Sequence, residues 1–130
     1  MPNTPCPCSP DKSLASCCGR YHQGACTPSA VALMRSRYSA FVLGLTDYIR
    51  DTTHPDQQND LDMATIADWS HNSRWLGLKV HRHGPIPDQP LKHFVEFTAF
   101  WADTSGAAQQ HHERSLFIKI QEHWYFIQPE

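Results

Sequence analysis

Four of the five cysteines of this chain form two close pairs near its N-terminus. Cys6 and Cys8 are separated by one proline, and Cys17 and Cys18 are adjacent. Four thiolates delivered as two pairs by a short loop suit a structural zinc ion, which takes a tetrahedral sulfur shell with Zn–S distances of about 2.3 Å and leaves no position for substrate. The sequence therefore predicts a metal site at these four cysteines, with zinc as the expected ion; iron also accepts sulfur-only coordination.

Disulfide bonds are the main alternative use of these cysteines, and inert thiols are a weaker one. A bond within either pair would close a very small, strained ring, so disulfides would have to cross between the pairs. The N-terminal residues show no basic and apolar regions of a secretory signal, and no stretch approaches the ~18 consecutive apolar residues of a membrane span. The pattern thus favours metal and a cytoplasmic location. Cys26 has no pairing partner and is not expected to be a ligand.

The segment from Cys6 to Gly19 resembles the SEC-C motif, a small metal-binding module also found at the C-terminus of the preprotein translocase ATPase. The rest of the chain is similar to the YchJ-like family of uncharacterised bacterial proteins. This similarity covers nearly the whole chain and runs through Cys18-Gly19-Arg20-Tyr21-His22, Leu33 to Phe41, Thr52 to Pro55, Trp75 with Gly77-Leu78, Val95 to Ala99, His112 to Ser115 and Trp124-Tyr125-Phe126. The resemblance implies a SEC-C module joined to an NTF2-like (cystatin-like) domain, a cone of helices packed on a curved antiparallel sheet, but no established activity.

Two positions depart from the family pattern. The SEC-C motif usually carries glycine after its second cysteine, where this chain has Ser9 followed by Pro10. The turn there must therefore accept a side chain. The family often has glycine before its final Trp-Tyr, where this chain has Glu122-His123, so the last hairpin turn is expected to differ. Neither change removes a predicted ligand.

Composition and cysteine placement predict two parts. The chain has 130 residues, of which 40% are hydrophobic and 18% charged, enough for one compact core beside a metal loop. A formal net charge of -2 gives no general electrostatic signal for nucleic acid. Because all the cysteines precede residue 27, we predict a zinc module at residues 1–26 and an NTF2-like domain at residues 27–130. Loss of metal is expected to unfold the first and leave the second mostly intact.

Periodicity predicts three helices followed by an antiparallel sheet, an α+β arrangement. Thr27 is the expected N-cap of an amphipathic helix that has Pro28 at its first position and ends near Gly44. A short helix at 47–53, a polar loop at 57–60 and a helix at 61–74 follow. Strands are predicted at 78–83, 94–101, 115–121 and 124–128, bounded by Gly84-Pro85, Ser105-Gly106 and Glu122-His123.

The implied fold often holds a pocket between its long helix and its sheet. The candidate lining residues are Arg37, Tyr38, His54, Glu96 and Trp101. Arg37 lies at the edge of the apolar helical stripe, where a partly buried guanidinium needs an anion. Glu96 and Glu113 are its candidate partners, and we favour a structural ion pair over an anion-binding pocket.

Histidine pairs raise the question of a second metal site. His81 and His83 share one face of a predicted strand, and His111 and His112 are expected beside a turn. A transition metal would need a third ligand from elsewhere in the fold, so exposed strand residues are the favoured interpretation.

Two functions from different classes remain. The favoured one is a non-enzymatic metal-binding protein whose SEC-C module contacts a protein partner, as the related module does in the translocase ATPase. The alternative is a small-molecule-binding protein or an enzyme that uses the pocket. No nucleophile elbow, phosphate loop or metalloprotease helix is present. A homodimer through an exposed sheet face is compatible with either function.

Overall fold

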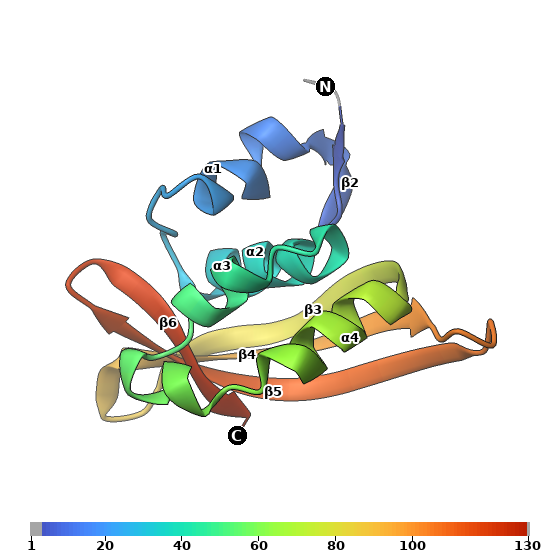
Figure 1. The fold of residues 1–130 in the computed structure, drawn as a ribbon. Helices are drawn as coiled ribbons and strands as arrows, with labels where there is room; N and C mark the ends of the chain where they lie inside the picture. Colours follow the sequence, from blue (N-terminus) through green and yellow to red (C-terminus); the bar gives the residue numbers. More distant parts are fainter. Residues whose placement is uncertain (1–3, 130) are drawn as a thin grey trace.

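The computed structural model describes residues 4–129 and confirms the α+β arrangement. Three helices, α2 (Ala30–Leu43), α3 (Thr46–Asp51) and α4 (Met63–Asn72), lie over one face of a four-stranded sheet, and the N-terminal segment sits above them (Figure 1). Residues 1–3 and 130, at the ends of the two predicted domains, lie outside the described part. No helix among the described residues is long and apolar enough to cross a membrane.

The N-terminal segment is a two-stranded hairpin followed by two short helical turns. It comprises β1 (Pro5–Cys6), β2 (Ser9–Ser13), the 3-10 turn η1 (Leu14–Ser16) and α1 (Cys18–His22). Ser9 pairs with Cys6 across the hairpin and has no positive φ. The turn therefore closes without the left-handed backbone that glycine would supply, which explains how this chain dispenses with the usual glycine.

The long helix α2 begins slightly later than predicted. Ser29, not Thr27, is the N-cap, because the Ser29 hydroxyl accepts a hydrogen bond from the Ala32 N–H at 3.1 Å. Pro28 therefore precedes the cap. The helix ends at Gly44 in the left-handed region (φ 75°), as predicted.

Helix α2 is buried on two faces, which a single apolar stripe did not predict. On one face Met34, Arg37 and Tyr38 point toward the sheet. On the other, Ser36 and Ser39 lie against the N-terminal segment, where the Ser36 carbonyl is 2.8 Å from His22 Nε2. Helix α2 thus forms the wall between the cysteine-rich segment and the interior of the larger domain.

The other helical elements differ from the predictions at their ends. Helix α3 stops at Asp51, and residues 57–60, expected to be a loop, belong to the 3-10 helix η2 (Pro55–Asp60). Helix α4 starts at Met63 because Asp62 caps it, accepting a hydrogen bond from the Thr65 N–H at 3.1 Å.

The sheet has the order β3-β4-β5-β6 and longer strands than predicted. Its strands are β3 (Arg74–Ile86), β4 (Gln89–Ala102), β5 (Ala108–Ile120) and β6 (His123–Pro129). The predicted end at Gly84-Pro85 is wrong, because β3 is an edge strand, where a proline costs no hydrogen bond of the ladder. His111 and His112 lie within β5, not beside a turn. The last turn places Gln121 (φ 49°) and Glu122 (φ 74°) in the left-handed region usually taken by glycine.

Candidate metal centre and ligand pocket

The four predicted cysteines meet at one point of the N-terminal segment. Cys6 ends β1, Cys8 lies in the hairpin turn, and Cys17 and Cys18 stand at the start of α1. Their Sγ atoms all lie within 4.8 Å of one another. Cys8 Sγ is 3.5 Å from Cys6 Sγ, 3.6 Å from Cys17 Sγ and 3.5 Å from Cys18 Sγ.

These separations fit a shared metal ion. A tetrahedron with metal–sulfur bonds of about 2.3 Å places its sulfurs about 3.8 Å apart, whereas a disulfide needs about 2.05 Å. All five cysteines are free thiols in the structure. Cys6, Cys8 and Cys18 are buried and Cys17 is partly buried, so the cluster is closed to a substrate. Cys26 is exposed and lies outside it, with its Sγ 3.5 Å from His123 Nδ1.

Local packing holds the cluster in place. Gly19 follows the last ligand, and a Cβ atom there would lie 2.7 Å from the Leu14 carbonyl oxygen. That oxygen accepts a hydrogen bond from the Cys17 N–H at 3.1 Å. From α2, Ser39 Oγ approaches Cys6 Sγ at 3.6 Å. The cluster is therefore supported both by its own segment and by the long helix.

The metal-free thiols share their protons unequally. Hydrogen bonds from neighbouring thiols, chiefly Cys18, lower the pKa of Cys8 to about 5. Burial raises the pKa of Cys17 to about 11, and the hydrogen bond to Cys8 raises the pKa of Cys18 well above its ordinary value. The Cys8 thiolate is thus stabilised by neighbouring thiols that keep their protons. A cation bound by the cluster would displace those protons.

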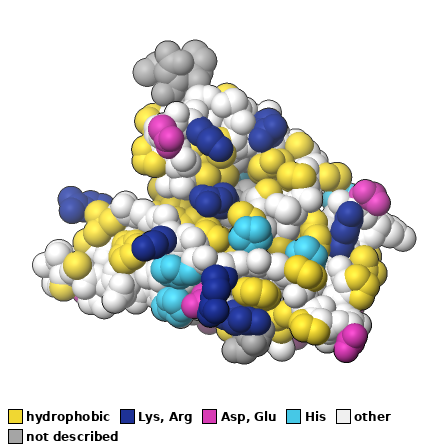
Figure 2. Space-filling model, turned by 180° about the vertical axis from the view of Figure 1, so that it is seen from behind, with side chains coloured by type: hydrophobic (Ala, Val, Ile, Leu, Met, Phe, Trp, Pro, Cys, Tyr) yellow, Lys and Arg dark blue, Asp and Glu magenta, His cyan; other side chains and the backbone are white. Residues whose placement is uncertain are grey.

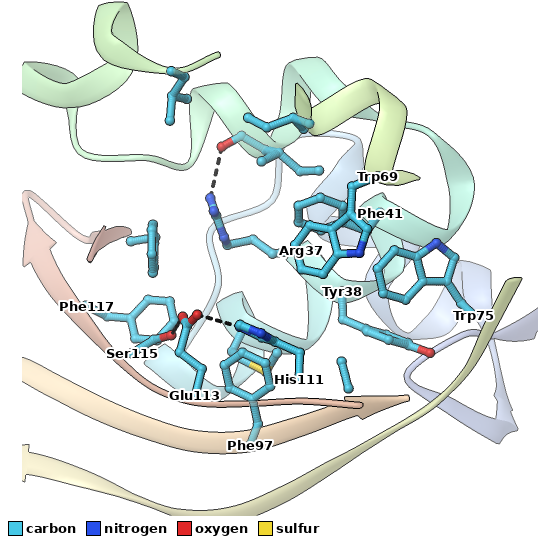
Figure 3. Close-up of a pocket in the computed structure, with 16 residues that line it drawn as sticks. Arg37, Tyr38, Phe41, Trp69, Trp75, Phe97, His111, Glu113, Ser115 and Phe117 are labelled. Carbon is cyan, nitrogen blue, oxygen red and sulfur yellow. Dashed lines mark hydrogen bonds and ion pairs between the residues drawn. The ribbon is translucent and has the colours of Figure 1, made fainter. Parts of the chain in front are cut away.

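A cavity of about 240 Å³ lies on the other side of α2, between the helices and the sheet (Figure 3). Sixteen residues line it, and most are apolar. Seven of them are aromatic: Tyr38, Phe41, Trp69, Trp75, Phe97, Phe117 and Phe126. Four polar or charged groups interrupt this lining, namely Arg37 on α2 and His111, Glu113 and Ser115 on β5.

The three polar residues on β5 are hydrogen-bonded to one another. They occupy every second position, so their side chains share the face of the strand that lines the cavity. His111 Nε2 lies 2.7 Å from one oxygen of Glu113, and the Ser115 hydroxyl donates to the other oxygen. Both carboxylate oxygens of Glu113 are therefore engaged.

Arg37 makes no ion pair, so the predicted pairing with Glu96 or Glu113 is wrong. No carboxylate among the described residues lies within 4.0 Å of its nitrogens. Its Nη1 donates to the Ile49 carbonyl at 2.9 Å and to the Thr52 hydroxyl at 2.8 Å. Burial lowers the pKa of Arg37 to about 10, which still leaves the guanidinium charged at neutral pH.

Of the five pocket candidates, the structure places Arg37 and Tyr38 in the lining and the others elsewhere. Glu96 points to the opposite face of β4, where it accepts a hydrogen bond from Arg82 at 2.7 Å. Trp101 packs against Trp69 with ring centroids 5.5 Å apart and lies outside the lining. His54 lies at the start of η2, where its Nδ1 accepts from the Asp56 N–H.

The polar lining residues that the pocket prediction missed are those of β5. His111, Glu113 and Ser115 alternate along the chain, which is the signal of a strand face. The predicted strand began only at residue 115, so this alternation was not recognised.

Histidines do gather on the outer face of the sheet, but not in the predicted pairing. His81 Nε2 and His112 Nδ1 lie 2.8 and 2.9 Å from the Thr98 hydroxyl. A bulge between Val80 and Arg82 breaks the alternation on which the expected pairing of His81 with His83 depended. Within residues 4–129, the four cysteines are the only group of three or more ligand-type side chains close enough to share a metal.

The structure defines a small α+β protein in which four cysteines able to hold a metal ion lie against the long helix of a helix-and-sheet domain. Residues 29–129 match the family model described as YchJ, middle NTF2-like domain. The chain therefore belongs to the YchJ-like family.

Two solved structures are similar over nearly the whole chain. One is a SEC-C motif containing protein from Psychrobacter arcticus, with 36% identity and a TM-score of 0.87, covering 98% of this chain and 82% of that one. The other is a SEC-C motif containing protein from Rhodopseudomonas palustris, with 35% identity and a TM-score of 0.86, covering 98% of each chain. The similarity thus includes the cysteine-rich segment as well as the NTF2-like domain.

Proposed function

We propose that this protein is a non-enzymatic, cytoplasmic interaction protein in which one structural zinc ion, held by Cys6, Cys8, Cys17 and Cys18, maintains the N-terminal module. The observation that carries the proposal is the closed convergence of four sulfur atoms within 4.8 Å. The SEC-C motif named in both similar structures supports it. We propose residues 1–26 as the module and residues 27–130 as the domain that carries it.

Elemental analysis of untagged protein, purified without chelators, tests the zinc assignment. We expect one zinc ion per chain and X-ray absorption that fits four sulfur ligands at about 2.3 Å. The Cys26→Ser variant is the matched control and should retain the ion, because Cys26 lies outside the cluster. Iron in place of zinc would point to a redox or metal-delivery role. Absence of metal from fresh, reduced protein would overturn the proposal.

A partner surface on the module is the second part of the proposal. Pro10, Asp11 and Lys12 on β2 are exposed, so this hairpin is open to contact. Most basic side chains on the face of the molecule seen in Figure 2 are separated by apolar and neutral surface. Together with the formal net charge of -2, this favours a protein partner over nucleic acid. Partners captured by the native protein should be lost with the double variant Cys17→Ser/Cys18→Ser. Their unchanged recovery would contradict this role.

Zinc binding is expected to release at least two protons at pH 7. The pKa of Cys17 is raised to about 11 and that of Cys18 is raised further, so both thiols are protonated before the metal arrives. Cys8, with a pKa lowered to about 5, contributes no proton at this pH. Calorimetry in buffers of different ionisation enthalpy measures the number. Because acid restores these protons, the zinc affinity should fall as the pH falls, and a pH-independent affinity would contradict the assignment.

Ser39→Ala is expected to weaken zinc binding without abolishing it. The Ser39 hydroxyl, fully buried, lies 3.6 Å from Cys6 Sγ and supports that ligand from α2. Loss of such an outer contact costs about 10- to 100-fold in metal affinity. A competition titration with a chromogenic chelator measures the change. Ser9→Ala, in the N-terminal hairpin, is the control, because the Ser9 hydroxyl donates to Asp11. Equal affinities of the two variants would argue against support from α2.

Ligand binding in the cavity is a second candidate function, favoured by one specific observation. The Arg37 guanidinium faces an apolar cavity and has no carboxylate partner among residues 4–129. Structural arginines in apolar surroundings are normally paired, so an unpaired one favours a binding site.

A further inference from the structure

The hydrogen bonds of Arg37 occupy only one side of its guanidinium. All three go from Nη1, to the Ile49 carbonyl and to the hydroxyls of Thr52 and Thr53. All three acceptors are neutral. The edge formed by Nε and Nη2, with its two parallel N–H directions, makes no hydrogen bond to any residue between 4 and 129.

That edge is the one with which arginine binds a carboxylate in a two-pronged manner. The same chain shows this use at Arg82, whose Nε and Nη2 both donate to Glu96, at 3.2 and 2.7 Å. Neither nitrogen of this edge in Arg37 belongs to the buried polar atoms without a partner, so both keep some accessible surface. Because Arg37 lines the cavity, this edge is the part of its guanidinium that we place within reach of a ligand there.

The position of Arg37 is fixed before any ligand arrives. Phe126 stacks against its guanidinium, with Arg37 Cζ 4.6 Å from the ring centroid. The hydrogen bonds to Ile49 and Thr52 hold Nη1 of the guanidinium in place. Figure 3 shows the guanidinium extended into the space between the helices and the sheet. A donor group that is already oriented loses little conformational entropy on binding.

The opposite wall offers no competing partner for Arg37. The Glu113 carboxylate is engaged by His111 and Ser115, although its charge still attracts Arg37 at longer range. The rest of the lining is apolar and mainly aromatic. The cavity of about 240 Å³ lies below the ~300 Å³ at the small end of pockets for drug-sized ligands, so its occupant is small.

From these features, and resting on the ligand pocket proposed above, we infer that the cavity binds a small monoanion with an apolar ring, of the class of aromatic carboxylates. Its carboxylate lies on the free edge of Arg37, and its ring packs among Phe41, Trp69 and Phe97. A single arginine without further cations suits one carboxylate better than a phosphate, whose second charge would be unbalanced in an apolar cavity.

The test compares 2-naphthoate with its neutral isostere 2-naphthamide in NMR titrations of the full chain. Binding in the cavity should shift the indole N–H signals of Trp69 and Trp75, which line it, and leave that of Trp124, which does not line it, unchanged. We expect the acid to bind at least about tenfold more tightly than the amide, the size of a charged hydrogen-bonded contact. Equal affinities would overturn the anionic class but leave a ligand pocket.

Three variants locate the contact. Arg37→Met should weaken 2-naphthoate about tenfold or more and leave 2-naphthamide unchanged within about twofold. Glu113→Gln should strengthen 2-naphthoate, because it removes the nearby negative charge; this result is informative even if Arg37→Met fails to fold. Arg82→Met, which changes an arginine on the outer face, should have no effect.

If neither compound shifts the indole signals of Trp69 or Trp75 at about 5 mM, both the ligand class and the pocket function fail. The zinc assignment, measured separately, is untouched by that result.

Discussion

Cys18→Ser is expected to remove the bound zinc and to unfold the N-terminal segment. Cys18 is 1% exposed and its Sγ contacts Cys8 Sγ at 3.5 Å, so a serine there supplies a poor ligand within an otherwise closed shell. Structural zinc contributes about 10–16 kcal/mol of apparent binding free energy in small zinc-dependent folds, as much as the whole stability of a typical domain. Loss of one ligand of four therefore removes the main stabilisation of this segment.

The effect is expected to extend beyond residue 26. Cys6, Cys8 and Cys18 belong to the same buried cluster as Leu33 and Met34 of α2. The sequence predicted that the larger domain would stay mostly intact. Because the core is shared, we expect the face of α2 that packs against the module to lose protection, whereas the sheet should stay folded. Hydrogen exchange measures this directly, with faster exchange expected in residues 5–22 and along α2 and native protection in β4 and β5.

Cys26→Ser is the matched control for this experiment. It makes the same chemical change at an exposed thiol outside the cluster, so metal content and exchange should stay native. Two results would contradict the argument: full zinc occupancy in Cys18→Ser, or uniform loss of protection that includes the whole sheet. The second would mean that the module and the domain fold as one unit.

The sequence predicted what depends on local spacing and missed what depends on tertiary partners. The ligand cysteines are close in the chain, so their spacing alone brought them together. The two-sided burial of α2 depends on a segment that packs against it from outside, and no periodicity within the helix reveals that. Glu96 was assigned to the pocket by residue type, but Phe97 faces the cavity, and strand alternation turns its neighbour away.

For Arg37 the sequence predicted the burial of the side chain but not its partner. Its position on the helix predicted burial and a need for an anion, and the structure places it at the cavity. Which acceptor it meets depends on the register of β5, where Glu113 is held by His111 and Ser115. The predicted ion pair with Glu113 does not form, because these two neighbours along the strand already occupy its carboxylate oxygens. Charge alone did not identify them as partners.

Gly19→Ala is expected to weaken the metal centre through the backbone, with every ligand still present. The added Cβ would lie 2.7 Å from the Leu14 carbonyl oxygen, a separation that real Cβ atoms do not adopt. The clash is with backbone, so it cannot be relieved by a side-chain rotation. Moving Leu14 disturbs the hydrogen bond from the Cys17 N–H, at 3.1 Å, and with it a ligand. We expect a loss of about 1–3 kcal/mol in stability, together with weaker zinc binding.

Gly84→Ala separates this steric effect from the general effect of replacing glycine. A Cβ at Gly84 meets nothing closer than Phe94 Cε1 at 3.7 Å, an ordinary contact, and the φ of this residue is not positive. Urea unfolding and chelator competition on both variants measure stability and zinc affinity. We expect only Gly19→Ala to lower both quantities, because only there does the new methyl group reach the backbone that positions Cys17. Native zinc affinity in Gly19→Ala would show that the backbone of this segment can shift to accept a methyl group. The close contact between α1 and η1 would then have no part in holding the ion.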